Sequence, residues 1–399
     1  MTTDPLEFSK LGGSPLCEMY ADVAVVTVTT RNYLYRARAL LASVKDLIPG
    51  ALRLACCVDP LENNLHPSGE DYLLVEASSL SLPRYPHLVL ALNPTALCCA
   101  LKPHAILHAF QQSGIKRVIY LDNDIGLYRT PSELLDALEQ HSFVVTPHHL
   151  APLPQGAEPN ELGLNSYGIF NAGMFALRKC TEAMDFIEWW GQWLLDPRHL
   201  ESHWGYDQAW LNYVPVYCPG AKILLDAGYN VAFWNILERD LWLDQGNCFC
   251  GSRPITAFHF SNFDENYPME ILSRGSVYCI PPTPATKALA SQLAESWTRF
   301  GRDQCLGWRY GYECWSNGEK IAESQRARIK CLWDDLPPAI DLFSERFRNE
   351  EPEYFRQVRA NFVVQQGGLL MRARVIGRRL LDVTPRKLLH RLCGTMTRR

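Results

Sequence analysis

The sequence predicts an α/β protein in which a mostly parallel β-sheet is flanked by helices. Short apolar runs of strand length alternate, up to about residue 265, with longer segments whose apolar residues recur at a helical period. A composition of 47% hydrophobic and 21% charged residues fits a folded body with a sizeable core. In sheets of this class, ligands bind at the carboxyl ends of the strands.

The first elements form a predicted βαβ unit. Residues 23–30 are a buried apolar strand, and residues 34–48 carry apolar side chains at helical spacing. Residues 52–58 are a second apolar strand. A strand, a helix and a strand in this order favour two parallel strands with the helix packed on one face of the sheet.

The next helix and strand lead to the most informative motif. Residues 97–110 predict a helix, in which Pro103 marks either a kink or the true start. Residues 118–121 predict a strand that ends directly before Asp122.

A well-marked helix start follows at Thr130. We predict that Thr130 caps this helix, that Pro131 occupies its first position, and that Glu133 completes a capping box. Residues 143–146 then predict another short strand.

The segment that follows is a long polar loop, residues 148–169. Such a loop in a compact domain is usually functional or poorly ordered, and we expect this one to contact substrate. Beyond it, residues 174–177 predict a strand, while residues 182–195 and 207–213 predict helices.

The pattern weakens past residue 265, which suggests a domain organisation in three parts. We predict one α/β domain at residues 1–265 and a mainly helical region at residues 266–368. Residues 369–399 form a basic tail. Pro281-Pro282 and Pro337-Pro338 are the expected joints.

The tail is strongly basic, whereas the rest of the chain is acidic on balance. Residues 371–399 hold nine Lys and Arg against a single acid, Asp382, interleaved with leucines. This pattern predicts an amphipathic helix that can lie on anionic lipid, although a packed terminal helix would show the same pattern. Because the charge is confined to the tail, nucleic-acid binding is not expected.

The rest of the chain shows no membrane-spanning or secretory signal. No run of about 18 apolar residues occurs, and the segment at Met1 lacks the basic and apolar regions of a signal peptide. We therefore expect a cytoplasmic protein, peripheral at the inner face of the membrane if the tail binds lipid.

Two carboxylates follow the strand at residues 118–121. Asp122 and Asp124 are one residue apart, and positions i and i+2 of an extended chain share a face. They can therefore present oxygen ligands together, which suits Mg²⁺ or Mn²⁺ bound to phosphate oxygens. Asp-x-Asp also occurs in solvated turns, so the motif alone leaves both interpretations open.

Six short motifs occur in order between residues 23 and 262: Asn32-Tyr33, Leu101-Lys102-Pro103, Tyr120-Leu121-Asp122-Asn123-Asp124, Phe170-Asn171-Ala172-Gly173, Asp207-Gln208 and His259-Phe260. Together they resemble the nucleotide-sugar glycosyltransferases of the GT-A fold, particularly the family 8 branch of bacterial galactosyltransferases and glycogenins. The region around residues 225–235 is similar to related bacterial cell-surface glycosyltransferases.

The resemblance implies a GT-A, Rossmann-like fold with a mixed, mostly parallel sheet and a helical C-terminal extension. It also implies that residues 1–265 are the nucleotide-sugar-binding and catalytic domain, with residues 266–368 on the acceptor side. It implies a divalent cation, Mn²⁺ or Mg²⁺, held by Asp122, Asp124 and His259, and it places Asp207 and Gln208 at the reacting anomeric centre. It also implies a set of residues that bind the nucleotide-sugar donor: Thr27, Thr29, Asn32, Tyr33, Lys102, Asp122, Asn123, Asn171, Ala172, Gly173 and Asp207.

The implied reaction moves a hexose from a nucleoside diphosphate sugar to a glycan or lipid-linked glycan acceptor, with UDP as the favoured nucleotide. A bound cation would neutralise the departing diphosphate. If Gln208 stabilises an oxocarbenium-like centre, retention of configuration follows. An inverting enzyme would instead need a carboxylate base, which Asp207 or Asp226 could supply.

One segment departs from the family pattern. After His-Phe the family commonly continues through Gly to a Lys-Pro-Trp that clamps the diphosphate, whereas this chain has Ser261-Asn262-Phe263-Asp264. The diphosphate-binding lysine therefore has no counterpart at its usual place.

Two other functions remain compatible with the same sheet. A nucleotidyltransferase acting on a sugar phosphate would normally carry a Gly-rich basic loop after the first strand, and Thr29-Thr30-Arg31-Asn32 is not Gly-rich. A non-catalytic sugar-nucleotide-binding protein would retain the fold without turnover. The presence of the metal-binding motif together with Asp207 favours an enzyme over such a binder.

Overall fold

The computed structural model describes residues 20–61, 69–152, 161–201, 205–261, 263, 283–315, 318, 320–331 and 333–335. The chain divides into two compact units, Met1–Glu313 and Cys314–Arg399. The segment at Met1, the expected proline joints and the basic tail at residues 369–399 lie outside the described residues. The predicted division into residues 1–265, 266–368 and 369–399 stays a prediction.

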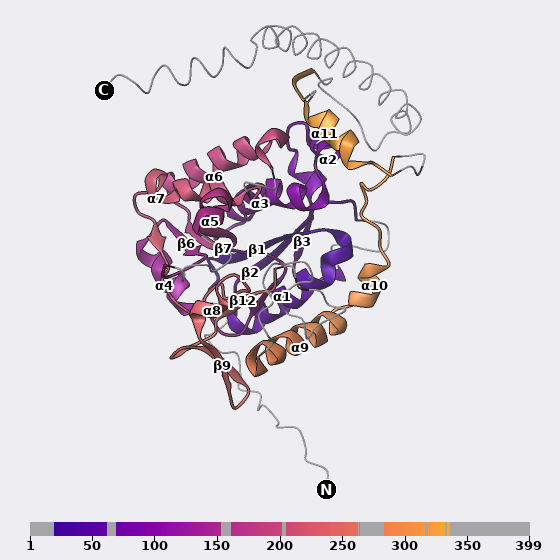
Figure 1. Cartoon of the computed structure of the whole chain (residues 1–399). Coiled ribbons are helices and arrows are strands. Elements are labelled where there is room, and N and C mark those ends of the chain that lie inside the picture. Colours follow the sequence, from indigo (N-terminus) through magenta and orange to yellow (C-terminus); the bar gives the residue numbers. More distant parts are fainter. Residues whose placement is uncertain are drawn as a thin grey trace, which may run out of the picture. The chain divides into compact units, whose positions relative to one another are not determined.

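A seven-stranded sheet forms the centre of the first unit (Figure 1), with strand order β3-β2-β1-β4-β7-β6-β8. Every neighbouring pair is parallel except those of β7, which runs antiparallel to β4 and β6. The predicted α/β class with a mostly parallel sheet is confirmed. The strands are β1 (Val23–Thr29), β2 (Leu52–Cys57), β3 (Leu73–Glu76), β4 (Arg117–Leu121), β6 (Phe143–Pro147), β7 (Phe170–Arg178) and β8 (Lys222–Ile223).

The strand order reverses between β1 and β4. From β1 the chain proceeds outward through β2 to β3, whereas β4 opens the other half of the sheet. Val26 pairs with Tyr120, so the carboxyl ends of the two strands lie side by side. A crevice outside such a switch point is the usual ligand site of open α/β sheets. The fold therefore brings the residues after β1 next to Asp122.

Helices cover both faces of the sheet (Figure 1). Helices α3 (Pro94–Phe110) and α6 (Thr181–Leu194) pack on one face, and α1 (Leu34–Leu47) packs on the other. Every residue of β1 is buried, as expected for a parallel strand covered on both sides. Val23 and Val25 face the α1 side. The residues that alternate with them face the opposite side of the sheet, which is also covered, so the sequence shows a continuous apolar run.

Helix α9 (Pro284–Arg299) joins the core on the α1 side. Its buried residues Leu289, Leu293 and Trp297 belong to the same apolar cluster as α1 and β1. Helix α10 (Arg302–Leu306) follows, and Cys305 is buried in that cluster too. The sheet therefore shares one continuous core with residues well beyond position 265.

Smaller elements complete the described part of the chain. The first unit contains η2 (Arg31–Tyr33), η4 (Ala77–Leu80), α2 (Tyr85–Ala91), β5 (Ile125–Leu127), α4 (Ser132–Gln140), α5 (Glu161–Tyr167), η5 (Pro197–His199), η7 (Gln208–Tyr213), α7 (Val214–Tyr217), α8 (Ile236–Arg239), β9 (Leu241–Asp244), β10 (Asn247–Cys250), β11 (Arg253–Pro254) and β12 (Ala257–His259). The second unit contains α11 (Glu323–Cys331) and η8 (Trp333–Asp335). None of the helices in the described ranges is long and apolar enough to cross a membrane.

The predicted cap of helix α4 is wrong. Pro131 precedes the first helical residue, and no side chain caps the helix. The Thr130 hydroxyl donates instead to the Leu47 carbonyl at the end of α1, while Glu133 binds Arg129 and the Tyr229 hydroxyl. Thr130 and Glu133, which the local pattern assigned to a capping box, therefore bind residues outside the start of α4 instead.

Two other local predictions need correction. The segment 148–169 is not entirely a loop, because α5 occupies Glu161–Tyr167. Pro103 lies inside α3, whose start is set by Asn93 accepting a hydrogen bond from the Ala96 N–H. The helix predicted at residues 207–213 is present as the 3₁₀-helix Gln208–Tyr213.

Candidate metal and donor site

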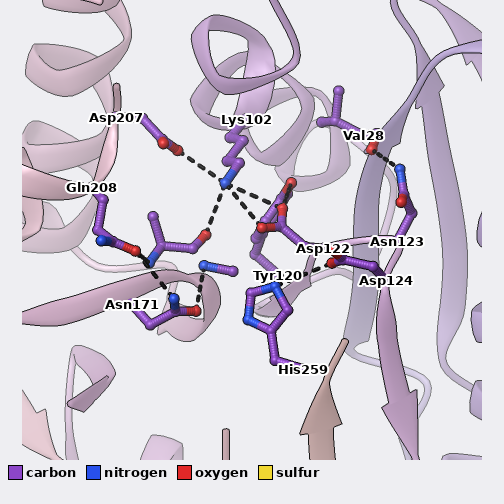
Figure 2. Close-up of polar contacts among 12 residues, drawn as sticks. Val28, Lys102, Tyr120, Asp122, Asn123, Asp124, Asn171, Asp207, Gln208 and His259 are labelled. Atoms are coloured by element: carbon purple, nitrogen blue, oxygen red, sulfur yellow. Dashed lines mark hydrogen bonds and ion pairs between the residues drawn. The ribbon is translucent and has the colours of Figure 1, made fainter. Parts of the chain in front are cut away.

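Two carboxylates and one imidazole meet at the switch point between β1 and β4. Asp122, Asp124 and His259 each offer a ligand atom, and these atoms all lie within 4.8 Å of one another. The His259 Nε2 is 3.1 Å from the Asp124 Oδ1 (Figure 2). The structure thus brings together the three residues for which the sequence implied a metal site.

The backbone explains how His259 reaches the carboxylates. Strand β5 begins directly after Asp124 and pairs antiparallel with β12, so that His259 lies opposite Ile125. The Phe260 N–H donates to the Asp124 carbonyl at 2.9 Å, and the His259 N–H donates to the Val231 carbonyl. This short two-stranded ladder fixes the imidazole beside the end of β4.

The spacing of these groups fits a hard divalent cation. Two ligands at right angles, each about 2.1 Å from an octahedral ion, lie roughly 3 Å apart, which matches the His259–Asp124 distance. Carboxylate oxygens suit Mg²⁺ and Mn²⁺, and an imidazole nitrogen is accepted more readily by Mn²⁺. The described residues therefore form a chemically coherent site for one divalent ion.

Gly173 provides the space for this site. It faces Asp122 across the β4–β7 pair, where the Asp122 N–H donates to the Gly173 carbonyl at 2.8 Å. A Cβ at this position would lie 2.4 Å from the His259 Cε1 and 2.7 Å from the Asp122 Oδ2. Any larger residue would therefore collide with two of the three candidate ligands.

The charges of Asp124 and His259 stabilise one another. Burial raises the pKa of Asp124, but the neighbouring imidazolium outweighs this effect and lowers that pKa to about 2. Burial lowers the pKa of His259, and the Asp124 carboxylate outweighs this and raises it above its usual range. A metal ion would take the place of the imidazolium proton as the positive charge beside Asp124.

Lys102 neutralises the carboxylates on the other side of the site. Its buried ammonium lies 3.1 Å from the Asp122 Oδ1 and 3.0 Å from the Asp207 Oδ2, and it donates to the Ala172 carbonyl at 3.1 Å (Figure 2). Burial lowers the pKa of Lys102, but the two carboxylates outweigh this and raise it well above its usual value. Helix α3 thus contributes a permanent positive charge to the crevice.

A hydrogen-bonded network fixes the amide groups of Asn171 and Gln208. The Gln208 Oε1 accepts from the Asn171 Nδ2 at 3.1 Å and from the Ala172 N–H at 3.2 Å, and its Nε2 donates to the Tyr167 carbonyl. The Asn171 Oδ1 accepts from the Gly173 N–H. Because every partner is identified, the orientation of both amides follows from the network.

His148 completes this network, although the sequence did not single it out. Its Nδ1 lies 3.0 Å from the Ile169 carbonyl and must donate to it, which leaves Nε2 to accept from the Asn171 Nδ2 at 3.3 Å. Burial lowers the pKa of His148 to about 4, so the ring is neutral at pH 7, as this arrangement requires. His148 directly follows β6, and only the sheet order brings it beside β7.

The residues after β1 line the neighbouring part of the crevice. Tyr33 is 38% exposed in η2, and Asn32 accepts a hydrogen bond from the Thr30 hydroxyl. The Asn123 amide donates to the Val28 carbonyl, which joins the turn after β4 to the end of β1. A contact of Asn32 and Tyr33 with a nucleotide stays a prediction.

Thr27 and Thr29, also in the implied donor set, are fully buried in β1. The Thr29 hydroxyl donates to the Thr30 carbonyl. Their roles in donor binding stay predictions.

Several supporting residues were not found by sequence reasoning. The Tyr120 hydroxyl donates to the Asp122 Oδ1 at 2.7 Å, and Trp234 packs edge-on against His259 with ring centroids 5.2 Å apart. Buried Asp59 accepts from the backbone N–H groups of Arg31 and Gly311. Tyr120 was recognisable, since it precedes Asp122 by two positions on one strand, whereas the others come from distant segments.

Comparisons with known proteins give distant relatives. No model of a known protein family matches the chain. Two proteins of Bacillus subtilis (strain 168), the uncharacterized YfnF and YfnD, are 22% and 21% identical to it over 249 and 247 residues. These alignments cover 60% and 59% of this chain, and 81% and 76% of the two relatives.

The similar solved structures are glycosyltransferases. The galactosyltransferase LgtC, solved with donor and acceptor sugar analogs, is 15% identical, covering 69% of this chain and 95% of its own, with a TM-score of 0.38. A glycosyltransferase involved in glycosylation of the major capsid of PBCV-1 is 11% identical, covering 69% and 98%, with a TM-score of 0.38. GlyE of Streptococcus pneumoniae is 15% identical, covering 69% and 61%, with a TM-score of 0.40.

Proposed function

We propose that this protein is a metal-dependent glycosyltransferase that moves a hexose from a nucleoside diphosphate sugar, UDP being the expected nucleotide, to a glycan or lipid-linked glycan acceptor. The observation that carries the proposal is the convergence of Asp122, Asp124 and His259 at the switch point, beside Tyr33 and the buried Lys102. A cation site at the end of β4 suits the diphosphate of such a donor. The exposed aromatic ring of Tyr33, after β1, suits its base.

The proposed metal ion is Mn²⁺ or Mg²⁺, held by Asp122, Asp124 and His259. When bound, such an ion acts as a Lewis acid that neutralises the charge developing on the departing diphosphate. Lys102 holds Asp122 in place and favours the ionised form of Asp207, because its ammonium lies about equally close to both carboxylates and counteracts the burial that raises the pKa of Asp207. Tyr120 orients the Asp122 carboxylate through its hydroxyl.

The donor sugar is proposed to lie against Asn171, Gly173, Asp207 and Gln208. The absence of a side chain at Gly173 lets Asp122 and His259 pack directly against the backbone of β7. Gln208 is held by three hydrogen bonds, so its amide is preorganised rather than free to rotate when the transition state forms.

Retention of configuration is the proposed stereochemical course. An inverting mechanism needs a carboxylate base that the acceptor hydroxyl can reach. Asp207 is only 2% exposed and forms an ion pair with Lys102, and Asp226 binds Arg253 and the Gly228 N–H. Both acids are committed to structural contacts, which favours a front-face reaction near Gln208.

A thermal-shift and product assay tests the proposal. With Mn²⁺ and a panel of UDP- and GDP-sugars, we expect a cation-dependent rise in melting temperature, because a ligand that binds only the folded state stabilises it by mass action. The Asp124→Ala variant should lose this rise. Asp71→Ala removes an exposed carboxylate of the first unit and should keep it.

The released product distinguishes the competing functions. Mn²⁺-dependent release of UDP from a UDP-sugar is expected of a glycosyltransferase. Release of pyrophosphate from a sugar phosphate and a nucleoside triphosphate would instead identify a nucleotidyltransferase. Binding without either product would identify a sugar-nucleotide-binding protein, and an unchanged thermal shift in Asp124→Ala would refute the metal assignment.

The acceptor side and the location of the protein remain parts of this proposal. A basic tail at residues 369–399 suits a lipid-linked acceptor at the inner face of a membrane, where anionic lipid would hold the protein. Nucleic acid is not a proposed partner, since residues 1–370 are acidic on balance.

A further inference from the structure

The segment after His259 lacks the cation that a diphosphate calls for. Ser261 and Phe263 stand where a lysine was expected, and Phe263 is buried against Phe260 and Trp297. A leaving diphosphate carries more negative charge than one divalent ion neutralises, so a positively charged side chain beside the metal is chemically favoured. The structure places a different residue next to this segment.

Arg36 lies in the first turn of α1, at the carboxyl edge of the sheet. Its guanidinium carbon is 4.3 Å from the ring centroid of Tyr33 and 4.3 Å from that of Trp297, and its Nε donates to the Tyr35 hydroxyl at 3.2 Å. A guanidinium presents its N–H groups in a planar fork, which is the geometry that binds phosphate oxygens.

The position of Arg36 relative to the metal site follows from a chain of contacts. Trp297, which Arg36 stacks on, packs edge-on against Phe263, and Phe263 packs against Phe260. The Phe260 N–H donates to the Asp124 carbonyl. Arg36 is therefore separated from Phe263 by a single aromatic ring, that of Trp297.

The neighbouring arginines lie in other directions. Arg31 binds the Asp59 carboxylate and the Arg309 carbonyl, and Arg38 binds Glu70. The N-terminus of α1 adds partial positive charge at the same edge of the sheet, because α1 follows β1 and begins there. Arg36 is thus the arginine of this turn that stands beside both Tyr33 and the segment after His259.

We propose that Arg36, stacked on Tyr33 and Trp297, binds the diphosphate of the nucleotide-sugar donor. It fills the role for which the segment 261–264 provides no lysine. The inference rests on the proposed function, since it assigns one contact of the same donor. It also gives a role to the contacts of Arg36 with exposed Tyr33 and with Trp297 of α9.

Calorimetric titration with UDP and UMP in the presence of Mn²⁺ tests this proposal in the full-length protein. The Arg36→Met variant keeps an unbranched apolar side chain against both rings but removes the charge. We expect its affinity for UDP to fall on the order of 10- to 100-fold, as for loss of a charge-assisted contact, while its affinity for UMP changes little. Arg36→Lys should fall between wild type and Arg36→Met.

The control variant is Lys45→Met, which removes one positive charge from the other end of α1, where Lys45 pairs with exposed Asp71. It should bind both nucleotides as the wild type does. Equal losses of UDP and UMP affinity in Arg36→Met would show that Arg36 only positions Tyr33, which would overturn the proposal. Unchanged UDP affinity in both Arg36→Met and Arg36→Lys would also overturn it. A wild-type protein that binds no UDP with Mn²⁺ would overturn the proposed function itself, which separates the two failures.

Discussion

At the scale of single residues, the site depends on where side chains are absent as much as on where they are present. Gly173 is a strand residue with ordinary backbone geometry, so its conformation does not require glycine. The requirement comes from His259 and Asp122, which occupy the volume that a Cβ would fill. The residue is therefore specified by the site rather than by the strand.

The Gly173→Ala substitution should impair the metal site directly. We expect a loss of Mn²⁺ affinity on the order of 10- to 100-fold, because two ligands must move, and a loss of stability of about 1–3 kcal/mol from overpacking. Titration calorimetry and urea unfolding measure the two effects. Gly69→Ala, whose Cβ would meet nothing within 4 Å, is the control. Full Mn²⁺ affinity in Gly173→Ala would contradict the assigned geometry.

Lys102 and Asp207 should be strongly coupled in the metal-free protein. Replacing Lys102 by Met leaves a buried carboxylate without its partner, so we expect a loss of roughly 3 kcal/mol in the free energy of unfolding. Adding Asp207→Asn should recover about 1 kcal/mol or more of that loss. Urea unfolding in the presence of a chelator measures this cycle.

The exposed pair Lys45–Asp71 is the matched control for that cycle. Its side chains are 60% and 59% exposed, so the corresponding cycle should give a coupling below about 1 kcal/mol. Similar coupling in both cycles would mean that burial of Lys102 does not set the strength of its ion pairs.

At the scale of elements, the packing of α3 against α6 contains a buried histidine. The His104 Nε2–H donates to the Gly191 carbonyl at 3.2 Å, and the helices approach so closely that a Cβ at Gly191 would lie 3.1 Å from the His104 Cε1. Burial lowers the pKa of His104 to about 4, from its usual value near 6.5. The interface therefore holds a neutral imidazole.

This histidine should make stability depend on pH. Between about pH 6.5 and pH 4 the unfolded chain binds the proton and the native state does not, so His104 lowers stability progressively as the pH falls. We expect wild type to lose roughly 2 kcal/mol more than His104→Gln over this range, because glutamine can donate to Gly191 but does not titrate. Denaturant unfolding at several pH values measures the difference, and parallel pH profiles would contradict it. His148 contributes with the same sign in both proteins.

At the scale of the whole molecule, the sheet and helix α9 share one core. The buried face of α9 packs into the cluster that also contains α1 and β1, which makes residues 284–299 part of the sheet's own stability. This arrangement also places Trp297 beside Arg36. A region expected to lie on the acceptor side thus also packs into the core of the sheet.

The Leu289→Ala substitution tests this coupling. We expect it to lower the free energy of unfolding by about 2–5 kcal/mol, and to speed hydrogen exchange of the β1 amides, because a 1% exposed side chain leaves a cavity in the shared core. Exposed Lys287→Ala should change neither. If β1 exchange stayed unchanged in Leu289→Ala, residues beyond 265 would form an independent unit, as the sequence-based boundary predicted.

The sequence predicted the parts of the fold whose signal is local. The runs at residues 23–30, 52–58 and 118–121 correspond to β1, β2 and β4, because a strand buried on both faces must be continuously apolar. The i, i+2 spacing of Asp122 and Asp124 likewise predicted a shared face. The small strands β9, β10 and β11 were missed, since two to four residues show no periodicity.

Amino-acid order alone therefore determined the α/β class and the principal strands and helices, and it singled out the side chains that we propose carry the chemistry. Tertiary structure decided how those side chains meet: β12 pairs with β5 to bring His259 to Asp124, β7 runs antiparallel to set Gly173 against Asp122, and α3 delivers Lys102 between two acids. It also decided the partner of the Thr130 hydroxyl, which donates to the Leu47 carbonyl at the end of α1 instead of capping α4. The physical reason is that hydrophobic periodicity reports which face of an element is buried, whereas register and long-range partners are chosen only when the elements pack together.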